Sequence, residues 1–285
     1  MLKQELCQLL ESKLNNLYNP QEINNIVNYF LRHAQHSTVP LRQDLASIQT
    51  TSWWEDWIEQ LLVKKPIQYI SGSAPFVHLD LLLNHKVLIP RPETEELAVM
   101  IDRDCRHENN LSVLDLGAGS GCIGFYLKSR HKDWRVVAID NDHASIACML
   151  DNMDHLQLNL EIIEMDFLKD SWDTLDKFNV VVSNPPYISK KEIPLMDESV
   201  LRYEPHAALF VPGDDPLIFY KKLMEFGKEH LHAGGRMYFE INEYHSQELY
   251  ELCKQETIYD CEIVKDIQSK ERFMVLIKHY NKTNL

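Results

Sequence analysis

The most restrictive feature of the sequence is the alternation, from about residue 111 onward, of short apolar runs with stretches of helical periodicity. Such alternation is typical of a parallel sheet whose strands are joined by crossover helices. The apolar runs span residues 111–117, 135–140, 160–166, 179–184 and 235–241. Two further runs, 261–267 and 272–279, predict an antiparallel pair. We therefore expect an α/β fold, a doubly wound Rossmann-like sheet that is mostly parallel with an antiparallel C-terminal strand.

The first 72 residues have a different pattern. Leucines recur at spacings of three and four from Leu2 to Leu17, which predicts an amphipathic helix. Asn19 followed by Pro20 indicates the cap and first turn of a second helix. A third helix is expected to carry the apolar residues Trp54, Trp57, Ile58, Leu61 and Leu62. The predicted organisation is a small all-helical domain over 1–72, a β-hairpin linker over 73–90 and the α/β domain over 91–285.

Composition narrows the class of protein. The 29 basic and 43 acidic residues give a formal net charge of -14, which disfavours a phosphate backbone as the main partner. The six cysteines are dispersed without a Cys-x-x-Cys pair, as in cytoplasmic proteins with reduced thiols. No histidine is accompanied by a ligand pattern, so no metal site is expected. No apolar run approaches membrane-spanning length, so a membrane partner is not expected either.

A glycine-rich turn ends the first apolar run of the α/β domain. It reads Asp115-Leu-Gly117-Ala-Gly119-Ser-Gly121 and leads into helix-forming residues. Glycines there permit a tight turn and let the backbone approach a ligand beside the start of the helix. Asp140 ends the next apolar run, where a carboxylate can accept from both hydroxyls of a ribose. Together these features predict a nucleoside-binding crevice.

The aspartates at the ends of the apolar runs indicate which kind of nucleoside would bind. The spacing Gly-x-Gly-x-x-Gly that begins at Gly119 also fits the dinucleotide fingerprint. Asp115 favours an ammonium group there, because a carboxylate repels a pyrophosphate. Asp166, followed by Phe167, ends the third run and can accept from the amino group of adenine; the alternative is that Asp166 caps a helix. With Asp140, these aspartates suit S-adenosyl-L-methionine, which has an ammonium, a sulfonium, a ribose and an adenine but no phosphate.

The fourth apolar run ends in Asn184-Pro185-Pro186-Tyr187. Proline cannot donate to a sheet ladder, so the strand must stop there. A planar NH2 group is a poor nucleophile because its lone pair is delocalised, and two acceptors aimed at its hydrogens would direct that lone pair toward a methyl carbon. The Asn184 side-chain oxygen and the Pro185 carbonyl can be these acceptors, and Tyr187 offers a ring to pack on the target. The alternative is a turn that only terminates the strand.

Five sequence motifs resemble one known family: "PIQYISGSAPF", "VLIPRPETEEL", "VLDLGAGSGCIG", "NPPY" and "EPHAALFVPGDDPL". Together the motifs resemble those of the HemK family, the glutamine-N5 methyltransferases of peptide chain release factors. The resemblance covers most of the chain. It implies methylation of the glutamine in the Gly-Gly-Gln motif of class 1 release factors, with S-adenosyl-L-methionine as the donor. We expect the enzyme to be cytoplasmic, from its dispersed cysteines, and monomeric. The order of the two domains in the chain suggests the further hypothesis that the helical domain recognises the substrate, with a long protein substrate docking across both domains.

The resemblance assigns residues to both parts of the site. The catalytic residues would be Asn184, Pro185, Pro186 and Tyr187. The residues that bind the cofactor would be Asp115, Gly117, Ala118, Gly119, Gly121, Asp140, Asn141, Asp166, Phe167, Asn184 and Thr94. The chain departs from the family pattern at Pro216, Asn242 and His245, which puts loop details in doubt more than the reaction.

Other functions stay open at this point. The target could be a ribosomal-protein glutamine or an exocyclic amino group in nucleic acid, although the net charge and the lack of a DNA-reading module count against nucleic acid. A nicotinamide dehydrogenase or a silent nucleotide-binding module is a further alternative. For a dehydrogenase, the sequence lacks an evident catalytic histidine or Tyr-x-x-x-Lys pair near the crevice.

Overall fold

The computed structural model describes residues 2–36 and 52–280. Contacts divide the chain into two compact units. One unit comprises Met1–Ser73 with Asp197–Tyr203, and the other comprises Ala74–Met196 with Glu204–Leu285. The first is helical and the second contains the large sheet.

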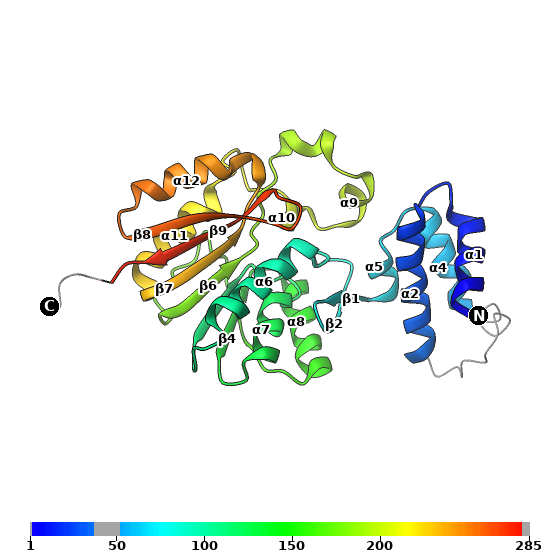
Figure 1. The fold of residues 1–285 in the computed structure, drawn as a ribbon, viewed down its shortest axis with the longest axis horizontal. Coiled ribbons are helices and arrows are strands. Elements are labelled where there is room, and N and C mark those ends of the chain that lie inside the picture. Colours follow the sequence, from blue (N-terminus) through cyan, green and yellow to red (C-terminus); the bar gives the residue numbers. More distant parts are fainter. Residues whose placement is uncertain (1, 37–51, 281–285) are drawn as a thin grey trace. The chain divides into compact units, whose positions relative to one another are not determined.

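In the helical unit, four of the described helices surround one small core (Figure 1): α1 (Leu2–Leu14), α2 (Pro20–His36), α4 (Ser52–Leu62) and α5 (Ile67–Ser71). The unit also includes α9 (Glu198–Tyr203), which contributes no residue to this core. The Asn19 side chain accepts from the backbone N–H groups of Gln21 and Glu22, and the Glu22 carboxylate accepts from the Asn19 N–H. This reciprocal pair is a capping box. The predicted cap of the second helix is therefore confirmed.

Aromatic packing dominates the core of this unit. The ring of Phe30 lies 4.7 Å from that of Trp54 and 4.8 Å from that of Trp57, both edge to face. Such aromatic pairs add stability beyond the area they bury. Leu62, expected in the same apolar stripe, is instead 47% exposed. Leu62 is the last residue of α4 and follows the buried Leu61 by about 100° around the helix axis, which turns it off the buried face.

The second unit is built on a seven-stranded sheet in the order β5-β4-β3-β6-β7-β9-β8. The strands are β3 (Ser112–Leu116), β4 (Arg135–Asp140), β5 (Glu161–Glu164), β6 (Phe178–Ser183), β7 (Leu231–Glu240), β8 (Tyr259–Lys265) and β9 (Glu271–Lys278). β3 to β7 pair in parallel, and β9 runs antiparallel to both β7 and β8. The predicted fold class is confirmed.

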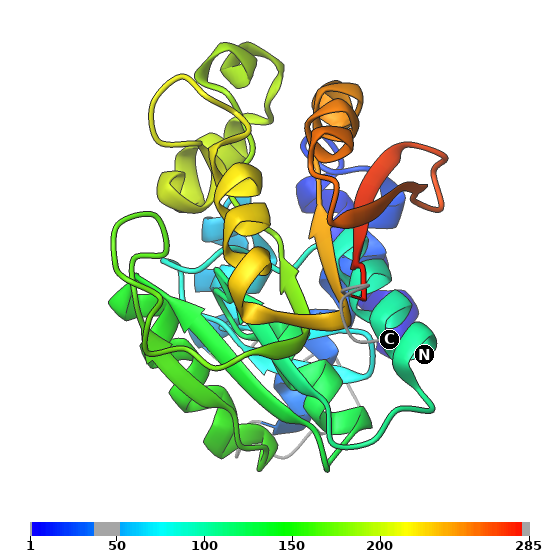
Figure 2. The same cartoon turned by 90° about the vertical axis from the view of Figure 1, so that its left-hand side faces the viewer.

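Helices cover both faces of this sheet (Figures 1 and 2). On one face lie α6 (Pro92–Cys105), α7 (Cys122–Arg130) and α8 (His143–Leu156), and on the other lie α11 (Ile218–His230) and α12 (Ser246–Gln255). Val113 packs into the first layer, while Leu114 and Leu116 pack into the second. Because both faces are buried, the central strands have continuous apolar sequences rather than alternating ones.

A small hairpin precedes α6. β1 (Ser73–Phe76) and β2 (Leu79–Leu82) form a two-stranded sheet, which accounts for the first half of the predicted linker. The shorter elements of the unit are η1 (Lys190–Leu195), α10 (His206–Leu209) and η2 (Glu243–His245). Among the described residues, no helix combines the length and apolar character needed to cross a membrane.

Candidate active site

Four neighbouring parallel strands end at one edge of the sheet. The register pairs Leu116 of β3 with Ile139 of β4 and with Ser183 of β6. One residue further on, Gly117, Asp140 and Asn184 therefore lie side by side. The chain runs outward from β3 through β4 to β5 and then returns to β6 on the other side of β3, so this edge is the topological switch point where open α/β sheets bind ligands. The structure brings these three predicted site residues together.

The glycine turn leaves space on one side and packs tightly on the other. Gly117, Gly119 and Gly121 have φ of 69°, 57° and 76°, the left-handed region that favours glycine. A Cβ at Gly117 would meet nothing within 4 Å, and one at Gly119 would meet only a Val87 methyl group at 3.8 Å. A Cβ at Gly121 would lie 2.7 Å from the ring of Phe125. The first two glycines thus line open space, whereas the third lets α7 pack closely.

Two carboxylates hold this turn from behind. The Asp115 side chain, only 1% exposed, accepts from the Gly124 N–H at 2.9 Å. Burial raises the pKa of Asp115 to about 7. The Asp140 carboxylate accepts from the N–H groups of Gly119 and Asp142, and burial raises its pKa as well. Both side chains therefore position the turn, while their predicted contacts with an ammonium group and a ribose stay predictions.

The end of β5 is organised by local contacts. The Asp166 carboxylate accepts from the Leu168 N–H and binds Lys169 Nζ at 2.6 Å, and Lys169 lowers its pKa. The Asn141 side chain also hydrogen bonds to Asp166. The Phe167 ring is 5% exposed and stacks on Trp172 at 5.0 Å within the core. The contacts of Asp166 are those of a local turn, and no helix begins at this described residue, so the alternative of a helix cap is wrong. A cofactor role for either residue stays a prediction.

A chain of side-chain hydrogen bonds organises the other half of the edge. Asn184 Nδ2 donates to Thr94 Oγ1 at 3.0 Å, and Thr94 Oγ1 donates to Glu240 Oε2 at 2.7 Å. The Tyr187 hydroxyl donates to Glu240 Oε1 at 3.0 Å. Thr94 is 3% exposed and Glu240 is 2% exposed. Burial raises the pKa of both Glu240 and Tyr187. Thr94, predicted beside the cofactor, is thereby fixed between Asn184 and a buried acid.

Two oxygen atoms at this position are unpaired hydrogen-bond acceptors. In the described part of the chain, neither Asn184 Oδ1 nor the Pro185 carbonyl oxygen accepts a hydrogen bond. Every buried side-chain nitrogen or oxygen there has a partner. Asn184 Oδ1, which has none, is therefore accessible. These are the two acceptors that the sequence analysis assigned to the target NH2 group.

An ion pair with a buried carboxylate fixes the beginning of α6. Arg91, at the N-cap position, places one guanidinium nitrogen 2.5 and 2.6 Å from the two carboxylate oxygens of Glu204. The Glu204 side chain is 2% exposed. Removing Arg91 would leave the buried charge of Glu204 uncompensated, which is destabilising. The pair therefore holds the helix turn that carries Thr94.

Two residues at the site were not predicted. Glu240 could have been identified as a site residue from the sequence, because it is a charged residue at the otherwise apolar end of β7. Asn152 of α8 accepts from the Leu82 N–H and donates to the carbonyl groups of Leu82 and Ser120. It thereby joins the β1–β2 hairpin to the glycine turn. No feature of the surrounding sequence distinguishes Asn152.

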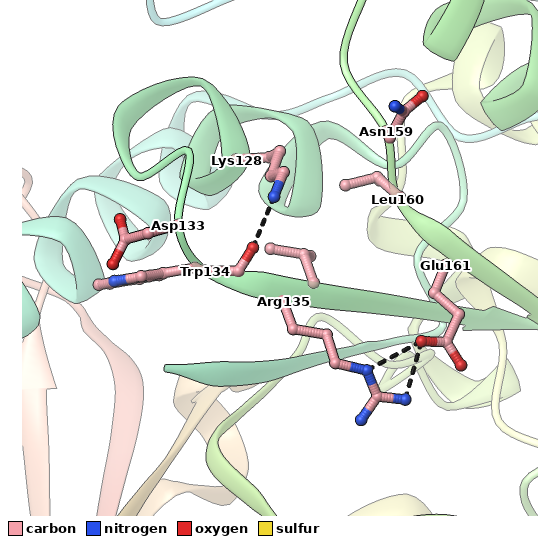
Figure 3. A pocket seen from close by; sticks show the side chains of 8 residues that line it. Lys128, Asp133, Trp134, Arg135, Asn159, Leu160 and Glu161 are labelled. Atoms are coloured by element: carbon pink, nitrogen blue, oxygen red, sulfur yellow. Dashed lines mark hydrogen bonds and ion pairs between the residues drawn. The ribbon is translucent and has the colours of Figure 1, made fainter. Parts of the chain in front are cut away.

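A separate hollow of about 420 Å³ lies at the opposite ends of the strands (Figure 3). Arg135 and Glu161 in its lining stand at the beginnings of β4 and β5 and pair with each other. Lys128 Nζ is bound to the carbonyl oxygens of Lys132 and Trp134. The charged groups that line this hollow are thus bound to each other or to the backbone, at the edge remote from the glycine turn.

The fold and the site together define a methyltransferase. Carboxylates at strand ends, an open glycine turn and two free acceptors at the switch point suit the cofactor of this class, S-adenosyl-L-methionine. The family model of the methyltransferase small domain matches residues 96–202. The chain is 38% identical over 224 residues, 78% of each chain, to the release factor glutamine methyltransferase of Flavobacterium psychrophilum.

A second relative extends this similarity. The release factor glutamine methyltransferase of Bacteroides thetaiotaomicron is 36% identical over 220 residues, 77% of this chain and 78% of the relative. The protein belongs to the release factor glutamine methyltransferase family, which confirms the resemblance found in its motifs. Among solved structures, a methyltransferase from Pyrococcus furiosus has the same fold, with a TM-score of 0.52, 15% identity, and coverage of 79% of this chain and 100% of that chain.

Proposed function

We propose that this protein transfers a methyl group from S-adenosyl-L-methionine to the side-chain amide nitrogen of the glutamine in the Gly-Gly-Gln motif of class 1 release factors. The observation that carries the proposal is the pair of free acceptors, Asn184 Oδ1 and the Pro185 carbonyl oxygen, beside the open glycine turn. Family membership supports the choice of a glutamine amide as the target.

The residues of the turn fit the cofactor. Gly117 and Gly119 face open space, where the part of the cofactor that contacts the backbone of the turn would lie. Asp140 and Asp166 supply carboxylate oxygens at two strand ends, suited to hydroxyl and amino groups. When bound, the cofactor supplies an electrophilic methyl carbon attached to a sulfonium ion. Asp115 lies behind the turn and supports it through Gly124.

The target half then presents the amide nitrogen. Asn184 Oδ1 and the Pro185 carbonyl accept the two amide hydrogens, which directs the nitrogen lone pair at the methyl carbon. With that methyl group supplied, the N–C bond would form as the C–S bond breaks, and the methylated nitrogen, then cationic and acidic, would release its proton to water. Glu240 need not act as the base, since both of its oxygens already accept hydrogen bonds.

The helical unit is proposed to recognise the release factor. Its separate core supports an independent role. Deleting residues 1–72 is expected to weaken binding of the intact release factor while calorimetry still detects S-adenosyl-L-methionine binding. Unchanged affinity for the release factor would remove this role.

The decisive experiment combines the purified protein, methyl-labelled S-adenosyl-L-methionine and a class 1 release factor. Mass spectrometry of the peptide that contains Gly-Gly-Gln should show one added methyl group on the glutamine. A release factor with that glutamine replaced by alanine is the matched control. Cofactor binding without methylation of the release factor would contradict the proposal, and label on a ribosomal protein or on nucleic acid would identify an alternative target.

A further inference from the structure

Glu240 lies beside Asn184 at the same level of the neighbouring strand, because the register pairs Ser183 with Phe239. We infer that Glu240 is a positioning residue that sets the orientation of the Asn184 amide, turning its NH2 group inward and its oxygen toward the target. This inference deepens the proposed function and rests on it for the role of the oxygen.

The orientation needs a cause, since the oxygen and nitrogen of an amide have almost the same shape. Packing alone does not distinguish the two orientations, and the hydrogen-bond network must do so. The Thr94 hydroxyl has one hydrogen. An ionised carboxylate only accepts, so Thr94 must donate this hydrogen to Glu240. Thr94 then has only lone pairs to offer Asn184, and only the NH2 group of Asn184 can bind them.

Burial is the largest influence on Glu240 and raises its pKa, while the specific contacts of its carboxylate stabilise the ionised form that this argument requires. Thr94 and Tyr187 each donate to one of its oxygens, and both bonds lower its pKa. Arg272 of β9 lowers it further by its positive charge. The nearby Glu93 of α6 adds to the upward effect of burial on this pKa. The carboxylate thus has a hydrogen-bond donor for each oxygen and one facing cation.

The directions of these hydrogen bonds predict that Glu240→Gln lowers turnover in the wild-type protein and raises it in the Asn184→Asp variant. Glu240→Gln offers one donor and one acceptor, so Thr94 is no longer forced to accept from Asn184, and turnover should fall about tenfold. Asn184→Asp places acceptors against the lone pairs of Thr94, and turnover should fall at least about a hundredfold.

In the double variant Asn184→Asp with Glu240→Gln, both hydrogen bonds of Thr94, to residue 184 and to residue 240, reverse their direction. The new amide donates to Thr94, and the Thr94 hydroxyl donates to the new carboxylate, whose outer oxygen still faces the target. Turnover should recover about tenfold over Asn184→Asp alone. Glu240→Gln therefore lowers turnover in one background and raises it in the other, a coupling of contacting residues that double-mutant cycles measure. Loss of turnover in both backgrounds would overturn the inference.

Two further measurements separate positioning from folding and from the identity of the substrate. Thr94→Ser keeps the hydroxyl and should retain turnover within a few-fold, whereas Thr94→Val should not. In ¹⁵N–¹H spectra without substrate, the Asn184 side-chain NH2 signal, assigned by its loss in Asn184→Asp, should move in Glu240→Gln. An unmoved signal would refute the inference even if release factors are methylated. A moved signal without methylation would refute only the proposed function.

Discussion

The two halves of the strand edge are held in place by different chemistry. On the β3–β4 side, carboxylates bind backbone N–H groups, as Asp115 binds Gly124 and Asp140 binds Gly119. On the β6–β7 side, side chains bind other side chains: Asn184 donates to Thr94, and Thr94 donates to Glu240. A backbone N–H has a direction set by the fold, whereas hydroxyl and amide groups can rotate.

This difference predicts which property of the enzyme depends on each half. Changes on the cofactor side should alter the shape of the turn and therefore cofactor affinity or stability. Changes on the target side should leave the turn intact and lower turnover. The following predictions test that division.

The largest effect is expected from Asn184→Ala. It removes one of two acceptors from the target without touching the glycine turn, so turnover should fall by about two orders of magnitude or more. Steady-state kinetics gives turnover, and calorimetry should show nearly unchanged cofactor affinity. An equal loss of cofactor affinity would mean that the two halves are not separable in this way.

A pair of alanine substitutions sharpens the description of the turn. Gly121→Ala drives a methyl group against the Phe125 ring, in addition to the strained φ, and should lower the free energy of unfolding by about 2–3 kcal/mol. Gly117→Ala has the same φ strain but open space around it, so it should cost about 1 kcal/mol of stability and weaken cofactor binding about tenfold. Denaturant titration and calorimetry distinguish the two. Similar behaviour of both variants would count against an open ligand side at Gly117.

The buried acid behind the turn predicts a pH dependence of stability. The pKa of Asp115 is raised from 3.8 to about 7 in the folded state, so between these values the folded protein binds a proton that the unfolded chain does not. Its contribution is complete below pH 3.8 and is lost as the pH rises through about 7. Relative to Asp115→Asn, the wild-type protein should gain about 1 kcal/mol per pH unit on acidification within that window. Parallel urea-unfolding curves at several pH values would measure it, and identical slopes would refute it.

The smallest effect is expected at the end of β5. The Lys169 side chain is 79% exposed and pairs with Asp166. Surface ion pairs contribute little, so Lys169→Ala should change the free energy of unfolding by less than about 0.5 kcal/mol. A larger loss would show that this turn depends on Lys169 rather than on the backbone bond from Leu168.

The sequence was sufficient for features set by local pattern. The run at 135–140 became β4 with the same bounds, and Asn19 caps α2 as expected. Features that depend on register between distant segments could not be derived. The contact of Thr94 with Glu240 joins α6 to β7, and no periodicity encodes it. The burial of the Phe167 ring likewise depends on Trp172 and on the helix packed above it.

The hydrogen bond between Thr94 and Glu240 also constrains when the enzyme becomes competent. These residues stand 146 positions apart in the chain, and Arg91 and Glu204 stand 113 apart. Contacts of such separation close large loops and form late in folding. A chain whose C-terminal strands have not yet joined the sheet can already possess its glycine turn, but it lacks an oriented Asn184. We therefore expect methyl transfer to reach its full rate only after β7 has docked, so that full catalytic activity would report completed folding.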